Sequence, residues 1–171
     1  MESFDRFPVL EMQGLVLREI TAEDVGWFYD HFNIREIVEA TAFPGPKDLD
    51  TAMEQLEGFI FTPFVKKTGF RWGITEKGRS RLIGSCGFYN WMKGGSNSAE
   101  MGYDLNPAYW GRGIMREALE TIVRFGFDRM GLNRIQATIP AHNNRSLTLI
   151  RRLGFVQEGV LRQWSFLVAG T

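Results

Sequence analysis

Residues 106–119 read Asn106-Pro-Ala-Tyr-Trp-Gly-Arg-Gly-Ile-Met-Arg-Glu-Ala-Leu119. A strand-like segment stops at Pro107, the chain turns through Gly111 and Gly113, and an amphipathic helix begins. Because glycine has no Cβ, the backbone can come close to a ligand, and the first turn of the helix carries unpaired N–H groups. The stretch is therefore either a cradle for an anion such as a pyrophosphate or a tight turn that binds nothing.

The two commonest nucleotide motifs do not fit this stretch. A dinucleotide-binding turn needs a third glycine three residues after Gly113, and Arg116 stands there instead. A P-loop needs a Gly-Lys-Ser/Thr ending, which is missing here. The spacing therefore argues against both kinds of site.

Length and composition indicate one folded unit. The 171 residues are 44% hydrophobic, which suits one core but not two, so we expect a single domain spanning residues 1–171. Twenty Lys and Arg balance twenty Asp and Glu, so no basic field predicts a nucleic-acid partner. The start shows no leader pattern, and no apolar run approaches the ~20 residues that span a bilayer. We expect a cytoplasmic protein without a membrane partner.

Cys86 is the only cysteine and lies in the apolar run Leu82-Ile-Gly-Ser-Cys-Gly-Phe88. A single cysteine cannot form an intramolecular disulfide and makes a zinc site improbable. It is either a small buried apolar side chain, which the run favours, or a nucleophile.

Hydrophobic patterning before the glycine turn predicts strands and helices in alternation. Leu15 to Ile20 has the pattern of a strand, Thr21 that of a helix cap, and Asp48 to about Val65 that of a second helix after the Phe43-Pro-Gly-Pro46 break. Three strands then follow across short loops, which predicts an antiparallel meander: Phe70–Thr75, Arg81–Trp91 and Ala99–Leu105.

After the glycine turn the pattern is again mixed. A helix is expected to about Met130, then a strand at Arg134–Ile139 and a helix from Asn143 that stops at Gly154. Two closing strands are expected at Phe155–Val160 and Gln163–Val168. This order predicts an α/β or α+β fold in one unit.

Five motifs in order resemble the GNAT superfamily of acetyl-CoA-dependent N-acetyltransferases, and most of all its branch of ribosomal-protein N-terminal acetyltransferases. They are Glu100-Met-Gly-Tyr103, Tyr109-Trp-Gly-Arg-Gly113, Glu117-Ala-Leu119, Asn143 with Ser146, and Leu153-Gly-Phe155. The resemblance implies a mixed, mostly antiparallel twisted sheet of about seven strands, flanked by about four helices and splayed between strands four and five. Trp110 and Met115 depart from the wider phosphate-loop pattern, which is tolerable if backbone groups hold the phosphate.

The resemblance also implies acetyl-CoA as co-substrate, with no metal. The loop that would hold its pyrophosphate comprises Gly111, Arg112, Gly113, Ile114, Met115 and Arg116. The backbone of Tyr103, Asp104 and Leu105 would bind the pantetheine arm, and an N–H near Leu105 would meet the thioester oxygen. Asn143 would contact the pantetheine arm, or act only as a helix cap.

Two side chains are candidates for proton transfer. The resemblance matches Ser146 to the group that protonates the departing thiolate, although it could instead cap or pack, and the thiolate needs little help at a thiol pKa of ~8.5. Glu100 is the candidate base. Some relatives draw the base from just past this strand, where Asn106 and Pro107 cannot serve, so the identity of the base stays open.

The acceptor is expected to be a primary amine. An α-amine of pKa ~8 costs only ~1.4 kcal/mol to deprotonate at pH 7, against nearly ~5 kcal/mol for a lysine amine, so a chain with an uncertain base suits a protein or peptide N-terminus. A small amine, such as a polyamine, antibiotic or amino acid, and a non-catalytic coenzyme A sensor or scaffold are the alternatives. Candidates for the acceptor pocket are Glu36, Glu39 and residues 43–46, and the final strand is a candidate edge for a homodimer.

Overall fold

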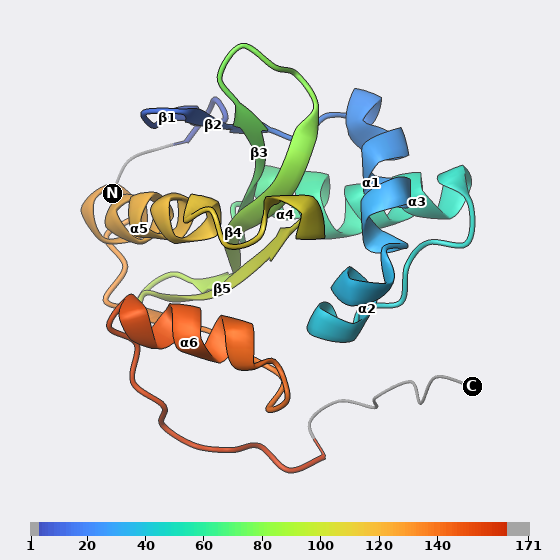
Figure 1. The fold of residues 1–171 in the computed structure, drawn as a ribbon. Coiled ribbons are helices and arrows are strands. Elements are labelled where there is room, and N and C mark those ends of the chain that lie inside the picture. Colours follow the sequence, from blue (N-terminus) through green and yellow to red (C-terminus); the bar gives the residue numbers. More distant parts are fainter. Residues whose placement is uncertain (1–3, 164–171) are drawn as a thin grey trace.

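A six-stranded sheet forms the centre of the computed structural model, which describes residues 4–163. The strands lie in chain order, and every neighbouring pair is antiparallel except β5 and β6, which are parallel (Figure 1). Their bounds are β1 Leu10–Glu11, β2 Leu15–Glu19, β3 Phe70–Glu76, β4 Leu82–Met92, β5 Ser98–Leu105 and β6 Arg134–Gln136.

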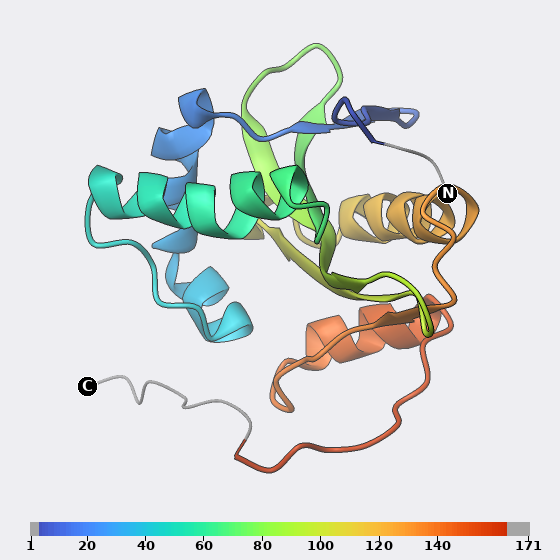
Figure 2. The same ribbon diagram turned by 180° about the vertical axis from the view of Figure 1, so that it is seen from behind.

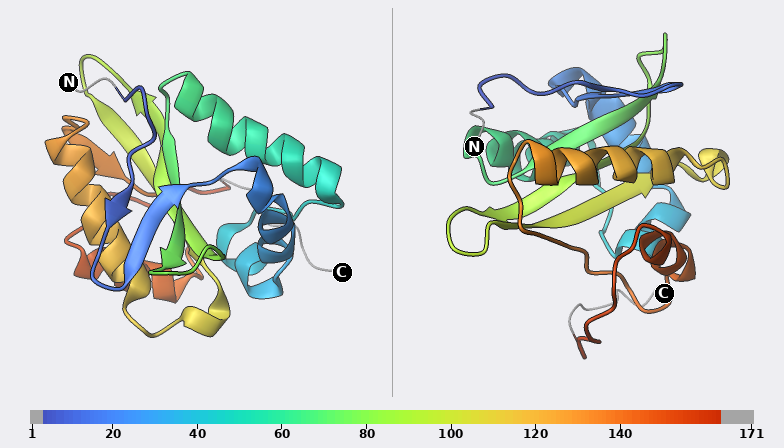
Figure 3. Two further views of the ribbon diagram at one scale, coloured as in Figure 1. Left: turned by 90° about the horizontal axis from the view of Figure 1, so that it is seen from above. Right: turned by 90° about the vertical axis from the view of Figure 1, so that its left-hand side faces the viewer.

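Helices cover both faces of this sheet. One face carries α5, Ile114–Asp128, and the other carries α3, Leu49–Leu56, as the view from above in Figure 3 shows. The remaining helical elements are η1 Ala22–Asp24, α1 Val25–Phe32, α2 Arg35–Thr41, η2 Glu57–Phe61, α4 Thr62–Val65, η3 Pro107–Tyr109 and α6 Asn144–Arg152. Seen from behind, α3, η2 and α4 follow one another as one long rod in front of the sheet (Figure 2).

Alternation along the strands divides the buried residues into two clusters. Phe70, Trp72 and Ile74 of β3 face α5 and join the larger cluster, in which the rings of Trp72 and Phe125 lie 5.3 Å apart. The smaller cluster lies under α1 and α3 and includes Phe28 and Leu56. On the sheet face away from α5, the polar side chains of Arg71, Ser85 and Asp104 are bonded to one another.

The sheet splays beside β5, as the resemblance implies. β5 and β6 pair only at Ser98, Ala99 and Glu100, after which the two chains part. The strand expected at Arg134–Ile139 is therefore three residues long, Arg134–Gln136, because the residues after it have no ladder partner on β5.

Three expectations about the elements need correction. Six strands are described where about seven were expected, and α2 at Arg35–Thr41 was missed. Residues 155–160 alternate like a strand but form none: Phe155 packs against the core, but Val156 is 84% and Val160 71% exposed, and no strand of the sheet pairs with the segment. The strand expected at Gln163–Val168 falls, beyond its first residue, outside the described part of the chain.

Within residues 4–163, no helix has the length and apolar character needed to cross a membrane.

Candidate active site

The glycine turn forms an open, uncapped helix end. Gly111 and Gly113 have φ of +76° and +78°, and no atom lies within 4 Å of a Cβ built on either. Gly113 is the N-cap of α5 and provides no side-chain cap, whereas Asp48 caps α3 and Asn143 caps α6. The first-turn N–H groups of α5 are therefore free to meet an anion.

Arginines surround this helix end. Arg112 lies 5.1 Å from the ring of Tyr109, and Arg145, in the first turn of α6, stacks 4.2 Å from the ring of Trp110. Arg116 is paired with Glu120 at 2.8 Å and so is already partly neutralised. Arg145 was not predicted from the sequence, because only the folded chain brings the start of α6 beside Trp110.

The open edge of β5 presents the backbone of Tyr103 and Leu105. Asn106 donates its N–H to Ile83 on β4 at 2.9 Å, and N–H directions alternate along a strand, so the N–H groups of Leu105 and Tyr103 point toward the splay. The Leu105 carbonyl accepts a 2.7 Å hydrogen bond from Trp110 Nε1. β6 does not pair with β5 at Leu105, so no strand within residues 4–163 accepts the Leu105 N–H. By the same alternation the backbone of Asp104 faces β4, unlike its two neighbours.

A buried hydroxyl lies in the same splay. Tyr103 Oη is inaccessible to solvent and makes no hydrogen bond of ordinary geometry to a residue between 4 and 163. Burial raises the pKa of Tyr103, and a looser hydrogen-bonding interaction with the Ser146 side chain acts in the opposite direction. Since a poorly paired buried hydroxyl is costly, the site fits a ligand with a polar group at this point. Open glycines, free N–H groups and this hydroxyl together suit the pyrophosphate and pantetheine of coenzyme A.

Asn143 joins the two halves of the site. Its Oδ1 accepts the Ser146 N–H at 3.1 Å, and its Nδ2 donates to the Ala40 carbonyl of α2 at 3.1 Å. His142 donates from Nε2 to the Glu39 carbonyl at 3.2 Å. Asn143 is thus the N-cap of α6. The segment around α2, which was expected to build the acceptor pocket, contacts the start of α6.

Glu100 lies on the opposite face of the sheet from Ser146. Its neighbours Ala99 and Met101 are buried in the cluster beneath α5, so Glu100 points to the α1 and α3 side. It borders a cavity of about 580 Å³ that Asn90 and Gln136 also line. Burial and the neighbouring Glu100 carboxylate raise the pKa of Tyr89. The two candidate proton-transfer groups therefore approach the splay from its two faces.

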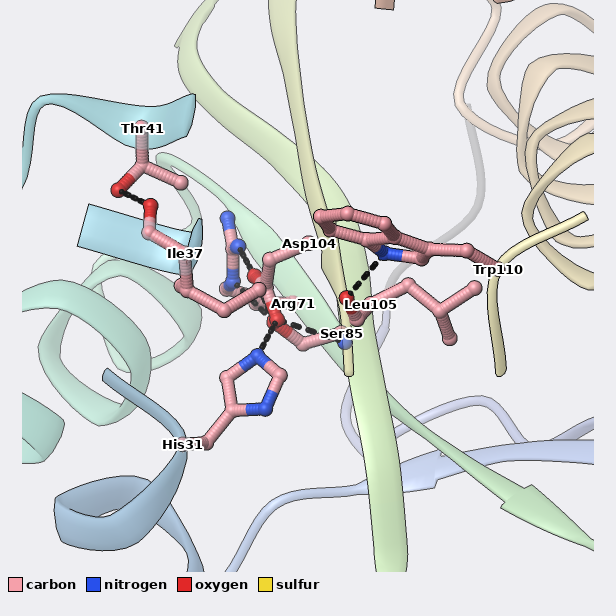
Figure 4. A network of polar contacts seen from close by, with 8 residues as sticks. All are labelled: His31, Ile37, Thr41, Arg71, Ser85, Asp104, Leu105 and Trp110. Carbon is pink, nitrogen blue, oxygen red and sulfur yellow. Dashed lines mark hydrogen bonds and ion pairs between the residues drawn. The ribbon is translucent and has the colours of Figure 1, made fainter. Parts of the chain in front are cut away.

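The Asp104 side chain is the centre of a buried polar network (Figure 4). Its Oδ1 contacts His31 Nε2 at 2.7 Å, and its Oδ2 contacts Arg71 Nη2 at 2.5 Å and Ser85 Oγ at 2.6 Å. Burial alone would raise the carboxyl pKa, but the charges and hydrogen bonds of His31, Arg71 and Ser85 outweigh it and lower the pKa to about 2. Asp104 is thus a charged side chain fixed inside the protein, directly below the open edge of β5.

The sequence offered a weak signal for this network. Arg71, Ser85 and Asp104 each stand between two non-charged, mostly apolar neighbours in their strands, and a buried polar residue in a strand needs partners. His31 could not be joined to them, because 73 residues separate it from Asp104.

Cys86 is fully buried and free, and burial raises its pKa to about 12. A thiol in this state remains protonated at neutral pH, which supports the reading as an apolar core side chain over that as a nucleophile. Residues 4–163 also contain no cluster of His, Cys, Asp and Glu arranged to hold a metal ion.

Comparison with known proteins agrees with this geometry. Residues 14–156 match the family model described as acetyltransferase (GNAT) domain. The uncharacterized N-acetyltransferase YoaA of Bacillus subtilis is 32% identical over 94% of this chain and 89% of its own length. The [ribosomal protein uS5]-alanine N-acetyltransferase of Escherichia coli is 31% identical over 57% of this chain and 50% of its own length. A solved structure of RimL, a ribosomal L7/L12 α-N-protein acetyltransferase in complex with coenzyme A, superimposes with a TM-score of 0.83 at 18% identity, covering 93% of this chain and 90% of that one.

Proposed function

We propose a specific acceptor for this chain, which belongs to the GNAT acetyltransferase family and is an acetyl-CoA-dependent N-acetyltransferase. The acceptor is the α-amine of a protein or peptide N-terminus. The uncapped end of α5 beside the splay carries the donor half of this proposal. The relative named for the alanine N-terminus of a ribosomal protein supports the acceptor half.

We assign a group to each part of the reaction. The N–H groups from Gly111 to Arg116 hold the pyrophosphate, and the open edge of β5 at Tyr103 and Leu105 holds the pantetheine arm. The free N–H of Leu105 faces the splay and is the donor to the developing oxyanion. Acetyl-CoA supplies the acetyl group, and the amine attacks it directly in a ternary complex.

Glu100 and Ser146 serve the two proton transfers. Glu100, from the face toward α1 and α3, accepts the proton of the attacking amine. Ser146, from the face toward α5, lies beside Tyr103 Oη, so the departing thiolate meets two hydroxyls.

Calorimetric titration with coenzyme A tests the donor half, because absence of binding at millimolar concentration would rule it out. A panel of acceptors assayed by thiol release tests the acceptor half. Turnover of peptides alone supports the proposal. Turnover of polyamines, antibiotics or free amino acids alone rejects the peptide acceptor. Coenzyme A binding without turnover of any acceptor indicates a sensor or scaffold.

Glu100→Gln should lower kcat/KM for a peptide by about tenfold at pH 7, because only about a tenth of an α-amine of pKa ~8 is neutral there. The loss should shrink as the pH rises through 8 and the amine loses its proton without help. Rate profiles from pH 6.5 to 9.5 check this. A loss that stays constant over that range would remove Glu100 from the role of base.

Ser146→Ala should lower kcat by less than about tenfold, since a thiol of pKa ~8.5 is a good leaving group. Ser146→Ala combined with Tyr103→Phe should cost more than the product of the two single effects if the hydroxyls substitute for each other. Single-turnover rates of the three variants measure this. Strictly multiplicative effects would show that the hydroxyls act independently.

A further inference from the structure

Arg71 is held rigidly and keeps one nitrogen free. Its Nε donates to Ser85 Oγ at 3.0 Å and its Nη2 to Asp104 at 2.5 Å. Nη1 makes no hydrogen bond to any residue between 4 and 163, and 22% of the side chain is exposed. A guanidinium fixed by two hydrogen bonds thus points its third donor group outward.

This free nitrogen lies over the strand that borders the splay. A Cβ built on Gly102 would be 3.2 Å from Arg71 Nη1 and 3.0 Å from the ring of Tyr89, so both side chains cover that glycine. Glu100 is two residues away on the same face of β5. Arg71 Nη1 and the Glu100 carboxylate therefore flank the point at which β6 leaves the sheet.

We infer that Arg71 selects acceptors that carry a carbonyl group next to the amine: Nη1 donates to the first carbonyl oxygen while Glu100 receives the amine. The inference rests on the proposed function, which places the attacking amine at Glu100. The dimensions are compatible. Nη1 lies over position 102, and positions 100 and 102 of a strand are about 7 Å apart. An α-amine and its own carbonyl oxygen are about 3 Å apart by bond geometry, so a hydrogen bond at each end spans a gap of this size.

Arg71 contributes a directed hydrogen bond at this point and not a net positive charge. The buried Asp104 carboxylate compensates the guanidinium charge, so what remains at Nη1 is a directed N–H group. A peptide N-terminus or an α-amino amide provides an acceptor for it. A polyamine provides none at this distance and would leave the N–H unpaired when water is expelled.

The experiment compares two acceptors in three proteins. The acceptors are an equimolar pool of X-Gly-Gly amides, X being each common residue, and isopropylamine, which keeps the α-carbon and a methyl but lacks the carbonyl. The proteins are wild type, Arg71→Lys, which keeps the positive charge beside Asp104, and Arg18→Lys. Arg18 is a matched control because it forms the same kind of pair, with Asp24 at 2.7 Å, on a different part of the sheet.

Arg71→Lys should lower the peptide-to-isopropylamine ratio of kcat/KM by about 20-fold, as expected for one lost hydrogen bond to a charged group, and Arg18→Lys should leave it unchanged. The ratio does not depend on the folded fraction of a variant, and the pKa difference between the acceptors cancels between proteins. Calorimetric titration of alaninamide into the coenzyme A complex should show the same loss of affinity.

An unchanged ratio in Arg71→Lys, with the wild type acetylating the pool, overturns the inference and leaves the proposed function standing. Wild-type turnover of isopropylamine without turnover of the pool rejects the peptide acceptor, and with it both the proposed function and the inference. Failure of the wild type to bind coenzyme A, or to acetylate any amine, is likewise a failure of the proposed function.

Discussion

Replacing Gly113 with aspartate should weaken coenzyme A binding by at least ~100-fold, because a carboxylate about 5 Å from two phosphate charges costs several kcal/mol even at an effective dielectric constant of ~20. Gly113 is the N-cap of α5, with φ +78° and open space where a side chain would project. The new carboxylate would also accept the first-turn N–H groups that the pyrophosphate needs. Calorimetry with coenzyme A measures the loss.

Gly113→Asn is the matched control. Asparagine has the same size and the same tolerance for a positive φ as aspartate, but it has no charge. We expect Gly113→Asn to weaken coenzyme A binding by less than about a tenth of the factor found for Gly113→Asp. Added salt should restore little affinity to the asparagine variant, whereas the loss in the aspartate variant should shrink at high ionic strength. Equal losses in both variants would mean that backbone strain, and not repulsion of an anion, is responsible.

Asp104→Asn should lower the free energy of unfolding by about 3–5 kcal/mol, the usual cost of removing one partner from a buried ion pair. Every group around the carboxylate is a donor to it: His31, Arg71, and both the N–H and hydroxyl of Ser85. An asparagine NH₂ cannot accept from any of them, so at least one donor loses its partner. Chemical denaturation measures the change, with Asp24→Asn, a more exposed pair with Arg18, expected to cost only about 1 kcal/mol.

The pH dependence of stability provides the second check on Asp104. Its pKa is about 2 in the folded protein, below its ordinary value of 3.8, so its contribution is fully present above pH 4 and is lost as the pH falls toward 2. The wild type should lose about 2 kcal/mol of stability over that range from this group alone, and Asp104→Asn should lack that part of the slope. A variant with the same acid slope as the wild type would show that Asp104 is not the group responsible.

Much of the fold could be predicted from local pattern. The Gly111-Arg-Gly113 turn, the cap at Asn143 and the alternation of Phe70, Trp72 and Ile74 depend on neighbours in sequence. The closing strand at residues 155–160 was predicted wrongly for a related reason. Its alternation matches a strand, but a strand needs a partner edge, and no local pattern reveals whether one is within reach.

The site divides in the same way. The loop residues from Gly111 to Arg116 stand together in sequence, so their motif predicted a cradle, and the resemblance predicted its ligand. Arg145, Arg71 and His31 acquire their neighbours only through folding. Arg145 stacks on a ring 35 residues earlier in the chain, and His31 reaches a carboxylate 73 residues later.

By itself the sequence determined the family resemblance, most of the elements and the glycine turn before α5, because each depends on short-range spacing and on backbone conformations that particular residues favour. Only the tertiary structure decided which face of the splayed sheet each polar group occupies: Glu100 and Arg71 on one side, Tyr103 and Ser146 on the other. The physical reason is that burial and charge pairing act through space. Four chain segments had to meet around Asp104 before Arg71 could be held by two hydrogen bonds with Nη1 lying over Gly102.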